Sequence, residues 1–194
     1  MSFRIEQKIA IDKNRLIDFK SFLVNKTAAQ IYEPRKIQSL YFDNANYEMY
    51  NDSQEGLTPR KKVRVRNYPG TQDKNLYLEI KISSVEGRFK SRKIINKDKF
   101  NDLKTKGMLD AQYGLCKPVL YVKYSREYLK IKDVRISLDS NIKYSLFSGR
   151  SLGEDENLIV ELKTSINKNL DELINDFPMQ RTRFSKYCNG IQKI

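Results

Sequence analysis

The chain of 194 residues contains no histidine. Histidine is the usual general base near neutral pH and the commonest zinc ligand, so its absence excludes Ser-His catalysis and the common zinc sites. Any catalysis must therefore depend on carboxylates, on Lys and Arg side chains, and on a metal ion that is bound through oxygen atoms.

Cysteine is also scarce, with Cys116 and Cys188 as the only two. Their spacing does not match a metal-binding motif, and two free thiols fit a reducing compartment. The sequence has no run of about 18 apolar residues, which a membrane-spanning helix would need. Because the N-terminal stretch MSFRIEQK lacks the apolar core of a signal peptide, we expect a cytoplasmic location.

Basic residues, in contrast, are abundant. The chain has 37 Lys and Arg residues against 24 Asp and Glu residues, which gives a formal net charge of +13. This charge predicts a polyanionic partner or an anionic surface, and nucleic acid, acidic lipid, nucleotide and inorganic polyphosphate all fit at this level. The length allows one domain with a substantial core, so we expect a single domain over residues 1–194.

Alternating apolar and polar residues predict eight β-strands. They are expected at residues 3–11, 36–43, 61–68, 75–83, 87–95, 117–128, 133–140 and 157–164. Helices are expected at 12–25, with Asp12 as a cap, and at 97–106 and 169–176, whereas 149–157 is expected to be a flexible loop. The pattern predicts an α+β, mainly β fold: a closed eight-stranded antiparallel barrel with a few covering helices, because closure leaves no exposed sheet edge.

Three of the predicted strands share a Glu-x-Lys pair. The pairs are Glu6/Lys8, Glu79/Lys81 and Glu161/Lys163. A fourth strand carries Arg64 and Arg66 at the same spacing, and residues two apart on a strand point to one face. Two architectures fit this pattern. Either the apolar faces form a conventional core and the charged faces meet water, or the apolar faces pack on helices and the charges line a channel.

Nine short pieces contain most of this pattern. They are RIEQK at 4–8, SLYFDN at 39–44, KVRVRNY at 62–68, YLEIK at 77–81, GRFKSR at 87–92, PVLYVKYSREYL at 118–129, VRISLD at 134–139, LIVELK at 158–163 and RFSKYCNGI at 183–191. In this order they resemble the triphosphate tunnel metalloenzymes, and among these the polyphosphate-polymerase (VTC) domain. That family has an eight-stranded barrel with a tunnel of basic and acidic side chains, so the resemblance favours charges inside a channel.

The resemblance also assigns roles to single residues. The implied phosphate-binding residues are Lys8, Arg64, Arg66, Lys81, Lys90, Arg92, Arg126, Arg135, Lys163, Arg183, Ser185 and Lys186. The implied catalytic residues are Arg64, Arg66, Lys81, Lys90 and Glu161. Glu161 matches the carboxylate that holds a divalent cation, with Glu6 and Glu79 as further candidates. Mn²⁺ or Mg²⁺ is the expected metal, since both prefer oxygen ligands.

Some polar residues have structural alternatives. Ser137 and Asp139 either neutralise neighbouring Arg side chains or contact metal or ligand. Tyr41, Tyr68 and Tyr77 are interpreted as packing residues rather than nucleotide-stacking residues. Lys104, Lys106 and the scattered surface lysines are interpreted as solvated charge, with guidance of a polyanion toward the tunnel as the alternative.

The implied function is transfer of the γ-phosphate of ATP to a growing inorganic polyphosphate chain. Many hydrolase and cyclase relatives begin with Glu-x-Glu-x-Lys, whereas here Arg4 replaces the first Glu, and this favours the polymerase branch. Hydrolysis of tripolyphosphate or of a nucleoside triphosphate and non-catalytic polyphosphate binding are the alternatives. Nucleic-acid binding is disfavoured because it predicts an exterior basic patch. An exported product would require a separate membrane partner, and the pattern predicts no oligomeric state.

Overall fold

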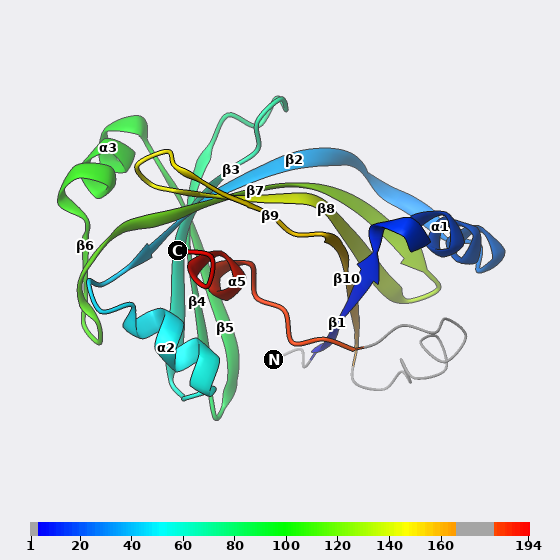
Figure 1. Cartoon of the computed structure of the whole chain (residues 1–194), viewed down its shortest axis with the longest axis horizontal. Coiled ribbons are helices and arrows are strands. Elements are labelled where there is room, and N and C mark those ends of the chain that lie inside the picture. The colour runs from blue at the N-terminus through cyan, green and yellow to red at the C-terminus, as the bar shows by residue number, and fades with distance from the viewer. Residues whose placement is uncertain (1–3, 166–180) are drawn as a thin grey trace. The chain divides into compact units, whose positions relative to one another are not determined.

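An antiparallel β-sheet dominates the chain (Figure 1). This computed structural model describes residues 4–165 and 181–194. The strands are β1 (Arg4–Asp12), β2 (Ala29–Asp43), β3 (Arg60–Asn67), β4 (Leu76–Ser84), β5 (Gly87–Ile95), β6 (Met108–Asp110), β7 (Gly114–Ile131), β8 (Val134–Leu146), β9 (Ser151–Glu154) and β10 (Asn157–Ser165). The helices are η1 (Lys13–Arg15), α1 (Leu16–Asn25), α2 (Glu48–Glu55), α3 (Lys97–Lys106) and α5 (Lys186–Ile191).

Eight strands pair in the order β1-β10-β8-β7-β2-β3-β4-β5, while β6 pairs with β7 and β9 with β8. The ladders β1–β10, β10–β8, β2–β3, β3–β4 and β4–β5 are antiparallel. These pairings confirm the predicted fold class, a mainly β chain with eight antiparallel strands and a few helices. The expected closure of the barrel is not observed within residues 4–165 and 181–194. There the sheet is open, with β1 and β5 as its end strands. Its end strand β5 is rich in exposed Lys and Arg, which discourage edge pairing.

All eight predicted strands are present, and β2, β7 and β8 extend beyond their predicted bounds. The short strands β6 and β9 were not predicted, and β9 lies within the expected loop at 149–157. Helices α1 and α3 are confirmed, whereas the helix predicted at 169–176 lies outside the described residues. The N-cap residue of the polar helix α2, Tyr47, makes no side-chain cap bond. Instead, Asp43 accepts hydrogen bonds from Met49 N and Tyr50 N, a contact that local spacing does not indicate.

Contacts divide the chain into two compact units. Unit 1 comprises Met1–Arg35, Tyr124–Ile142 and Glu154–Phe184, and unit 2 comprises Lys36–Lys123, Lys143–Gly153 and Ser185–Ile194. The chain passes from one unit to the other within β2, β7 and β8. The single domain expected over residues 1–194 stays a prediction.

The core of unit 1 lies between α1 and one face of β1, β8 and β10. Its buried members are Ile9, Ile11, Phe19, Leu23, Ile131, Ile136, Leu138, Leu158, Val160 and Leu162. Burial of each large apolar side chain contributes roughly 1.5–3 kcal/mol. Asp12 caps η1 at the start of the helical segment, as expected, by accepting a hydrogen bond of 2.8 Å from Asn14 N. Because side chains alternate along strands, the charged residues of β1, β8 and β10 lie on the face opposite α1.

The core of unit 2 contains residues from its strands and from α2 and α5, which pack side by side (Figure 1). Val63 and Val65 of β3 are buried, as are Met49 of α2 and Ile191 of α5. A Cβ atom on Gly190 would lie 2.4 Å from Leu120 and 2.6 Å from Tyr144. Glycine is therefore required for the close approach of α5 to these side chains of β7 and β8.

Candidate functional site

The charged side chains of unit 2 form rows across β3, β4 and β5, because the antiparallel register places them directly opposite one another. The rows are Lys62–Lys81–Lys90 and Arg64–Glu79–Arg92. Three strands thus present their alternate positions as one basic face around a single carboxylate. We call these residues, together with Arg66, the unit 2 basic rows.

Glu79 is the centre of the unit 2 basic rows. Arg64 donates two hydrogen bonds to Glu79 Oε2, of 2.8 Å from Nε and 2.6 Å from Nη2. Lys90 Nζ donates to Oε1 at 2.6 Å. Arg66 Nη1 lies 3.8 Å from Oε2, and Arg92 Nε lies 3.6 Å from Oε1. Four basic side chains therefore lie within ion-pair distance of one carboxylate that is 1% exposed.

The electrostatics of these rows keep Glu79 ionised. Burial acts to raise the pKa of Glu79, but Arg64 and Arg66 outweigh it and lower the pKa to about 2. The pKa of Lys90 is lowered, chiefly by burial and in spite of Glu79. Both oxygens of Glu79 accept hydrogen bonds from cations, so this geometry gives no support to Glu79 as a metal ligand.

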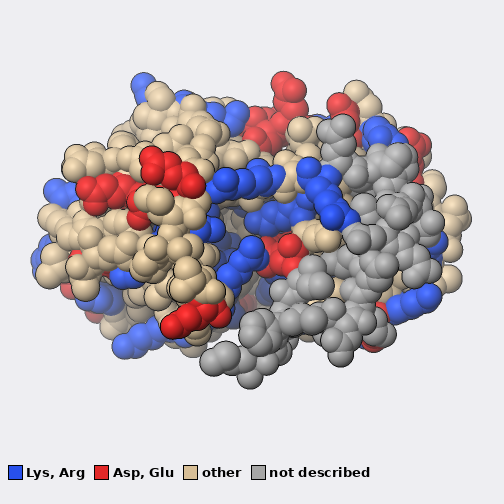
Figure 2. Space-filling view, turned by 90° about the horizontal axis from the view of Figure 1, so that it is seen from below, with Lys and Arg blue, Asp and Glu red and all other residues tan. Residues whose placement is uncertain are grey.

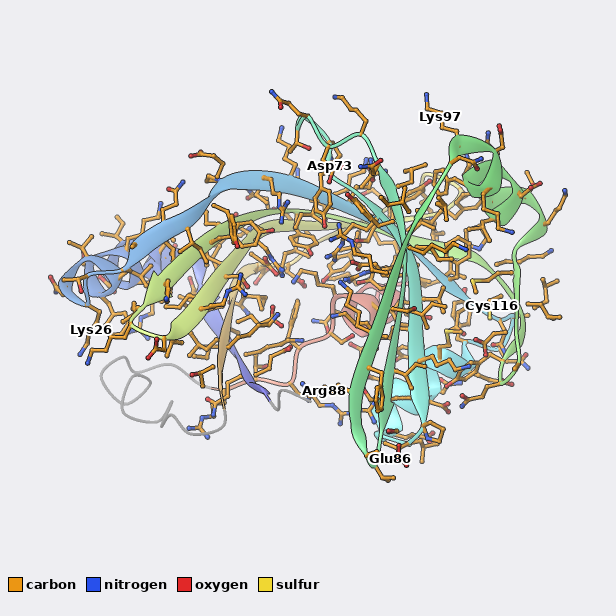
Figure 3. The ribbon with its side chains drawn as sticks, turned by 180° about the vertical axis from the view of Figure 1, so that it is seen from behind. Lys26, Asp73, Glu86, Arg88, Lys97 and Cys116 are labelled. Carbon is orange, nitrogen blue, oxygen red and sulfur yellow. The ribbon has the colours of Figure 1, made fainter. Side chains whose placement is uncertain are left out.

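Two tyrosines hold Arg92. Its guanidinium lies 3.6 Å from the ring centroid of Tyr77, and its Nη2 donates to Tyr68 OH at 3.2 Å. Tyr77 OH in turn donates to Asp73, in the loop between β3 and β4 (Figure 3), at 2.9 Å. These contacts agree with the interpretation of Tyr68 and Tyr77 as packing residues. The Arg92 side chain is still 41% exposed, so it can reach a ligand.

Helix α5 contacts the same rows through Ser185. Lys62 Nζ donates to Ser185 Oγ at 2.9 Å, and this oxygen also accepts from Cys188 N to cap α5. Lys186 follows at the start of the helix and is half-buried. Lys62 was not among the predicted site residues. Its place two residues before Arg64, on the same strand face, is the signal that indicates it.

Unit 1 has rows of a different composition across β1, β10 and β8. They are Glu6–Lys163–Arg135 and Lys8–Glu161–Ser137. Lys163 Nζ lies 3.2 Å from Glu161 Oε2 and 3.9 Å from Glu6 Oε2. Ser137 Oγ donates to Glu161 Oε2 at 3.4 Å. We call this group the unit 1 mixed rows, since carboxylates and amines alternate in it.

Glu6 and Glu161 interact directly. The pKa of Glu6 is raised by burial, by a hydrogen bond with Glu161 and by the charge of Glu161. Burial acts to raise the pKa of Glu161 as well, but the bond with Glu6 and the charges of Lys163 and Arg126 hold it well below its usual range. Two adjacent carboxylates with a hydroxyl nearby form an oxygen donor set.

This donor set can be compared with the needs of a divalent metal. Within residues 4–165 and 181–194, no group of three or more cysteine or carboxylate side chains is placed to hold a metal ion. Mg²⁺, however, is commonly bound through one or two carboxylates together with substrate phosphates and water. Glu6 and Glu161 therefore fit a metal ion that arrives with a phosphate ligand.

Asp139 lies beside the mixed rows and pairs with Arg126. Arg126 Nε and Nη2 donate to its two oxygens at 2.5 and 2.7 Å, and Asp139 is 1% exposed. Although burial acts to lower the pKa of Arg126, nearby Tyr124, Asp139 and Glu161 raise it overall. Of the two expected roles of Asp139, this geometry favours neutralisation of Arg126. Arg126 Nη2 also lies 3.8 Å from Glu161 Oε2.

The other predicted residues of unit 1 lie at its surface or along its edge. Arg135 and Arg183 are exposed. Lys8 Nζ donates to the carbonyl oxygen of Phe184 at 2.9 Å and lies 3.8 Å from Glu6 Oε1. Lys8 thereby connects β1 to the segment that precedes α5.

The charged strand faces of both units include buried residues. Arg64, Arg66 and Glu79 are buried in unit 2, and Asp139 and Glu161 in unit 1. Ordinary solvated faces do not bury their charges, so the alternative of a charged face that simply meets water does not describe these residues. On the face that Figure 2 shows, Lys and Arg side chains lie beside Asp and Glu side chains.

Comparisons with known proteins agree with the predicted fold. A family model described as the VTC domain matches residues 3–194. A candidate adenylate cyclase from Bacillus halodurans has 14% identity and a TM-score of 0.63, with 100% of this chain and 97% of that chain covered. A candidate adenylyl cyclase from Hippeastrum, described as having a dominant triphosphatase activity, has 13% identity and a TM-score of 0.63, with 98% and 96% covered.

A third solved structure, a candidate adenylate cyclase from Vibrio parahaemolyticus, has 15% identity and a TM-score of 0.59, with 98% of each chain covered. At these identities the likeness shows a shared fold. No curated protein matches the chain by sequence. Among the helices in the described part of the chain, none is long and apolar enough to cross a membrane.

Proposed function

This chain belongs to the VTC-domain family, and on that premise we propose that it is a polyphosphate polymerase that transfers the γ-phosphate of ATP to inorganic polyphosphate. The observation that carries the proposal is the set of four basic side chains around buried Glu79. One carboxylate cannot neutralise four cations, so the unit 2 basic rows favour an anion with several charges. A chain of phosphates is such an anion.

The unit 2 basic rows would bind phosphate with side chains that are already ordered. Arg64 is held by Glu79 and by Tyr41, and Arg66 Nε donates to Ser39 Oγ at 3.2 Å. A charge-assisted hydrogen bond contributes about 1.5–3 kcal/mol, so a few of them suffice for a firm hold on a triphosphate. Ordered donors also lose little conformational freedom when the ligand binds.

The transfer itself needs no proton acceptor. The bond from the γ-phosphorus to the bridging oxygen breaks, ADP leaves, and the phosphorus bonds to the terminal oxygen of the acceptor chain. That oxygen is already anionic, which agrees with a chain that has no histidine. Arg64, Arg66, Lys81 and Lys90 would stabilise the charge of the transferring group.

The unit 1 mixed rows would hold the divalent metal through Glu6 and Glu161. When bound there, Mn²⁺ or Mg²⁺ would neutralise phosphate oxygens and make the phosphorus more electrophilic. Lys8 and Lys163 lie within 4 Å of these carboxylates, where they would contact the same phosphate oxygens. We leave Glu79 out of the proposed metal set because cations surround it. A tunnel that encloses the phosphates, and a cytoplasmic location, stay predictions.

Hydrolysis is the second candidate, and one observation favours it. Water must lose a proton when it attacks phosphorus, and the unit 1 mixed rows contain carboxylates, one of which could accept it if it does not hold the metal. The Hippeastrum protein of similar fold is described as a triphosphatase. The same basic rows would then serve a reaction with water as acceptor.

One incubation tests the proposal. Purified protein is mixed with ATP and Mn²⁺, and the products are sized by gel electrophoresis. Polyphosphate chains with one ADP per added phosphate are the expected result. Free phosphate without chains would identify a hydrolase, and binding without turnover would identify a binding module.

Three variants test the site. Arg64→Ala, Arg66→Ala and Glu161→Gln should each lower turnover strongly, whereas Lys106→Ala should not. Lys106 is a matched control because it is an exposed base that pairs only with Asp102 of its own helix among the contacts of the described residues. If all three variants turned over ATP like the wild type, the site would be assigned wrongly.

A further inference from the structure

We propose that Tyr41 is a further phosphate-binding residue, which donates the hydrogen bond of its phenol to a phosphate oxygen of the substrate. Tyr41 lies on β2 and is paired in register with Arg64 of β3, so it borders the unit 2 basic rows. The inference deepens the proposed function and rests on it, because it requires that the rows bind phosphate.

Among the described residues, the Tyr41 hydroxyl accepts a hydrogen bond but has no acceptor for its own proton. Arg64 Nη1 donates to the Tyr41 oxygen at 2.8 Å, so in this bond the hydroxyl is the acceptor. Within residues 4–165 and 181–194, this is the one hydrogen bond that the Tyr41 hydroxyl makes. The side chain is nevertheless buried, with 4% exposure, and a buried donor without an acceptor is costly.

The charged neighbours of this hydroxyl cannot accept the proton. The cations that act on it are Arg64, Arg66 and Lys186, whose guanidinium and ammonium groups are donors only, and the nearby carboxylate of Glu79 makes its hydrogen bonds with Arg64 and Lys90 instead. The partner that we infer is therefore an oxygen brought by a ligand, and the tests below distinguish it from a water molecule. Arg64 contacts the hydroxyl, and the charges of Arg66 and Lys186 also act on it, which favours an anion. A phosphate oxygen bound by Arg64 would lie within reach of the phenol.

The ring of Tyr41 is held in place, as a binding residue requires. It stacks on the ring of Tyr187, with centroids 5.1 Å apart and planes inclined by 22°. Tyr187 OH donates a short hydrogen bond to Asp43, which also accepts from Met49 N and Tyr50 N. The hydroxyl of Tyr41 is therefore aimed by α5 and by the start of α2, and not by the substrate.

The first test compares two buried tyrosines of unit 2. Binding of tripolyphosphate is measured by titration calorimetry for the wild type, Tyr41→Phe and Tyr113→Phe. Tyr113 is the matched control, since its hydroxyl donates to Asp52 at 2.7 Å and accepts from Lys61 N at 3.3 Å, so its proton already has an acceptor in the protein. Tyr41→Phe keeps the stacked ring and should bind about tenfold more weakly, the effect of losing one hydrogen bond to a charged group. Tyr113→Phe should bind like the wild type.

The second test separates direct contact from an effect through Arg64. In an Arg64→Ala background, Tyr41→Phe should weaken binding of tripolyphosphate by a further severalfold, because the phenol contacts the ligand itself. No further loss would mean that Tyr41 acts only by positioning Arg64, and the inference would be wrong.

Failure of the inference and failure of the proposed function look different. If the wild type does not bind tripolyphosphate, the basic rows are not a phosphate site and the proposed function fails. If the wild type binds it, Arg64→Ala weakens binding, and Tyr41→Phe binds like the wild type, then a water molecule accepts the proton and only this inference is overturned.

Discussion

The two units place charges on strand faces in opposite proportions. In unit 2, four basic side chains surround the single carboxylate of Glu79. In unit 1, the carboxylates Glu6 and Glu161 lie next to each other and share Lys163. The same alternation of side chains along the strands thus produces a cluster of cations in unit 2 and a pair of carboxylates in unit 1. An excess of cations suits phosphate, whereas adjacent carboxylates suit a metal ion that accompanies it.

The largest effect is expected from Arg64→Ala in unit 2. This change removes the residue that donates twice to Glu79 and once to Tyr41. It leaves a buried carboxylate with weaker partners and removes a phosphate donor, so turnover of ATP should fall by about 100-fold or more. Steady-state kinetics check this, with Lys106→Ala as the control. A change of less than threefold would contradict the role given to the basic rows.

Glu161→Gln should also lower turnover by roughly 100-fold, but through the metal. The variant should need more Mn²⁺ for half-maximal activity, since one of two carboxylate ligands is lost. Glu79→Gln is the matched comparison from unit 2, and its Mn²⁺ requirement should equal that of the wild type. If the Mn²⁺ requirement rose equally in Glu161→Gln and Glu79→Gln, the proposal that only unit 1 holds the metal would be contradicted.

Glu79→Gln is expected to act on stability. Loss of the carboxylate leaves Arg64 and Arg66 buried without their shared counter-ion, which should lower the free energy of unfolding by about 3–5 kcal/mol. Tripolyphosphate should restore much of that loss, because it supplies the missing anion. Urea unfolding with and without tripolyphosphate measures both effects. A variant as stable as the wild type would show that Glu79 does not balance these cations.

The pH dependence of stability follows from the same residue. The pKa of Glu79 is lowered from an ordinary 4.5 to about 2, so the folded state holds this carboxylate ionised. The contribution of the ionised Glu79 carboxylate to the free energy of unfolding is fully present above pH 4.5 and is lost as the pH falls toward 2. The difference in stability between the wild type and Glu79→Gln should therefore shrink over that window. A constant difference in acid titrations would contradict the assigned ion pairs.

The smallest effect is expected from Lys81→Ala. Lys81 belongs to a basic row, but it is exposed and lies between two other lysines, Lys62 and Lys90. Exposed charges are well screened by water and salt, so turnover should fall by only about threefold to tenfold. If Lys81→Ala lowered turnover as much as Arg64→Ala, burial would not determine how much each basic residue contributes to turnover.

Much of this arrangement could be predicted from the sequence. Period-two alternation located eight strands and placed Glu6 with Lys8, and Arg64 with Arg66, on one face of their strands. It could not show which residues of different strands meet, because register depends on turns and on distant pairing. The rows that join Arg64 to Glu79 and Glu6 to Lys163 therefore appear only in the fold.

Other features depend on contacts that local patterns do not record. Asp43 of β2 accepts hydrogen bonds from Met49 N and Tyr50 N in the first turn of α2, and the stack of Tyr41 on Tyr187 joins β2 to α5. The family resemblance made Glu79 a further candidate for the metal site. Its neighbours in the fold are four cations, an arrangement that the sequence pattern does not indicate and that favours a role as their counter-ion.

The most direct test of the central claim follows a single phosphorus atom. The protein is incubated with γ-labelled ATP, Mn²⁺ and unlabelled tripolyphosphate as acceptor, and the label is located after separation by chain length. The label is expected in chains longer than tripolyphosphate, in amounts equal to the ADP formed, and Arg64→Ala should lower it by about 100-fold or more. Label found only in free phosphate would contradict the proposed transferase and identify a hydrolase.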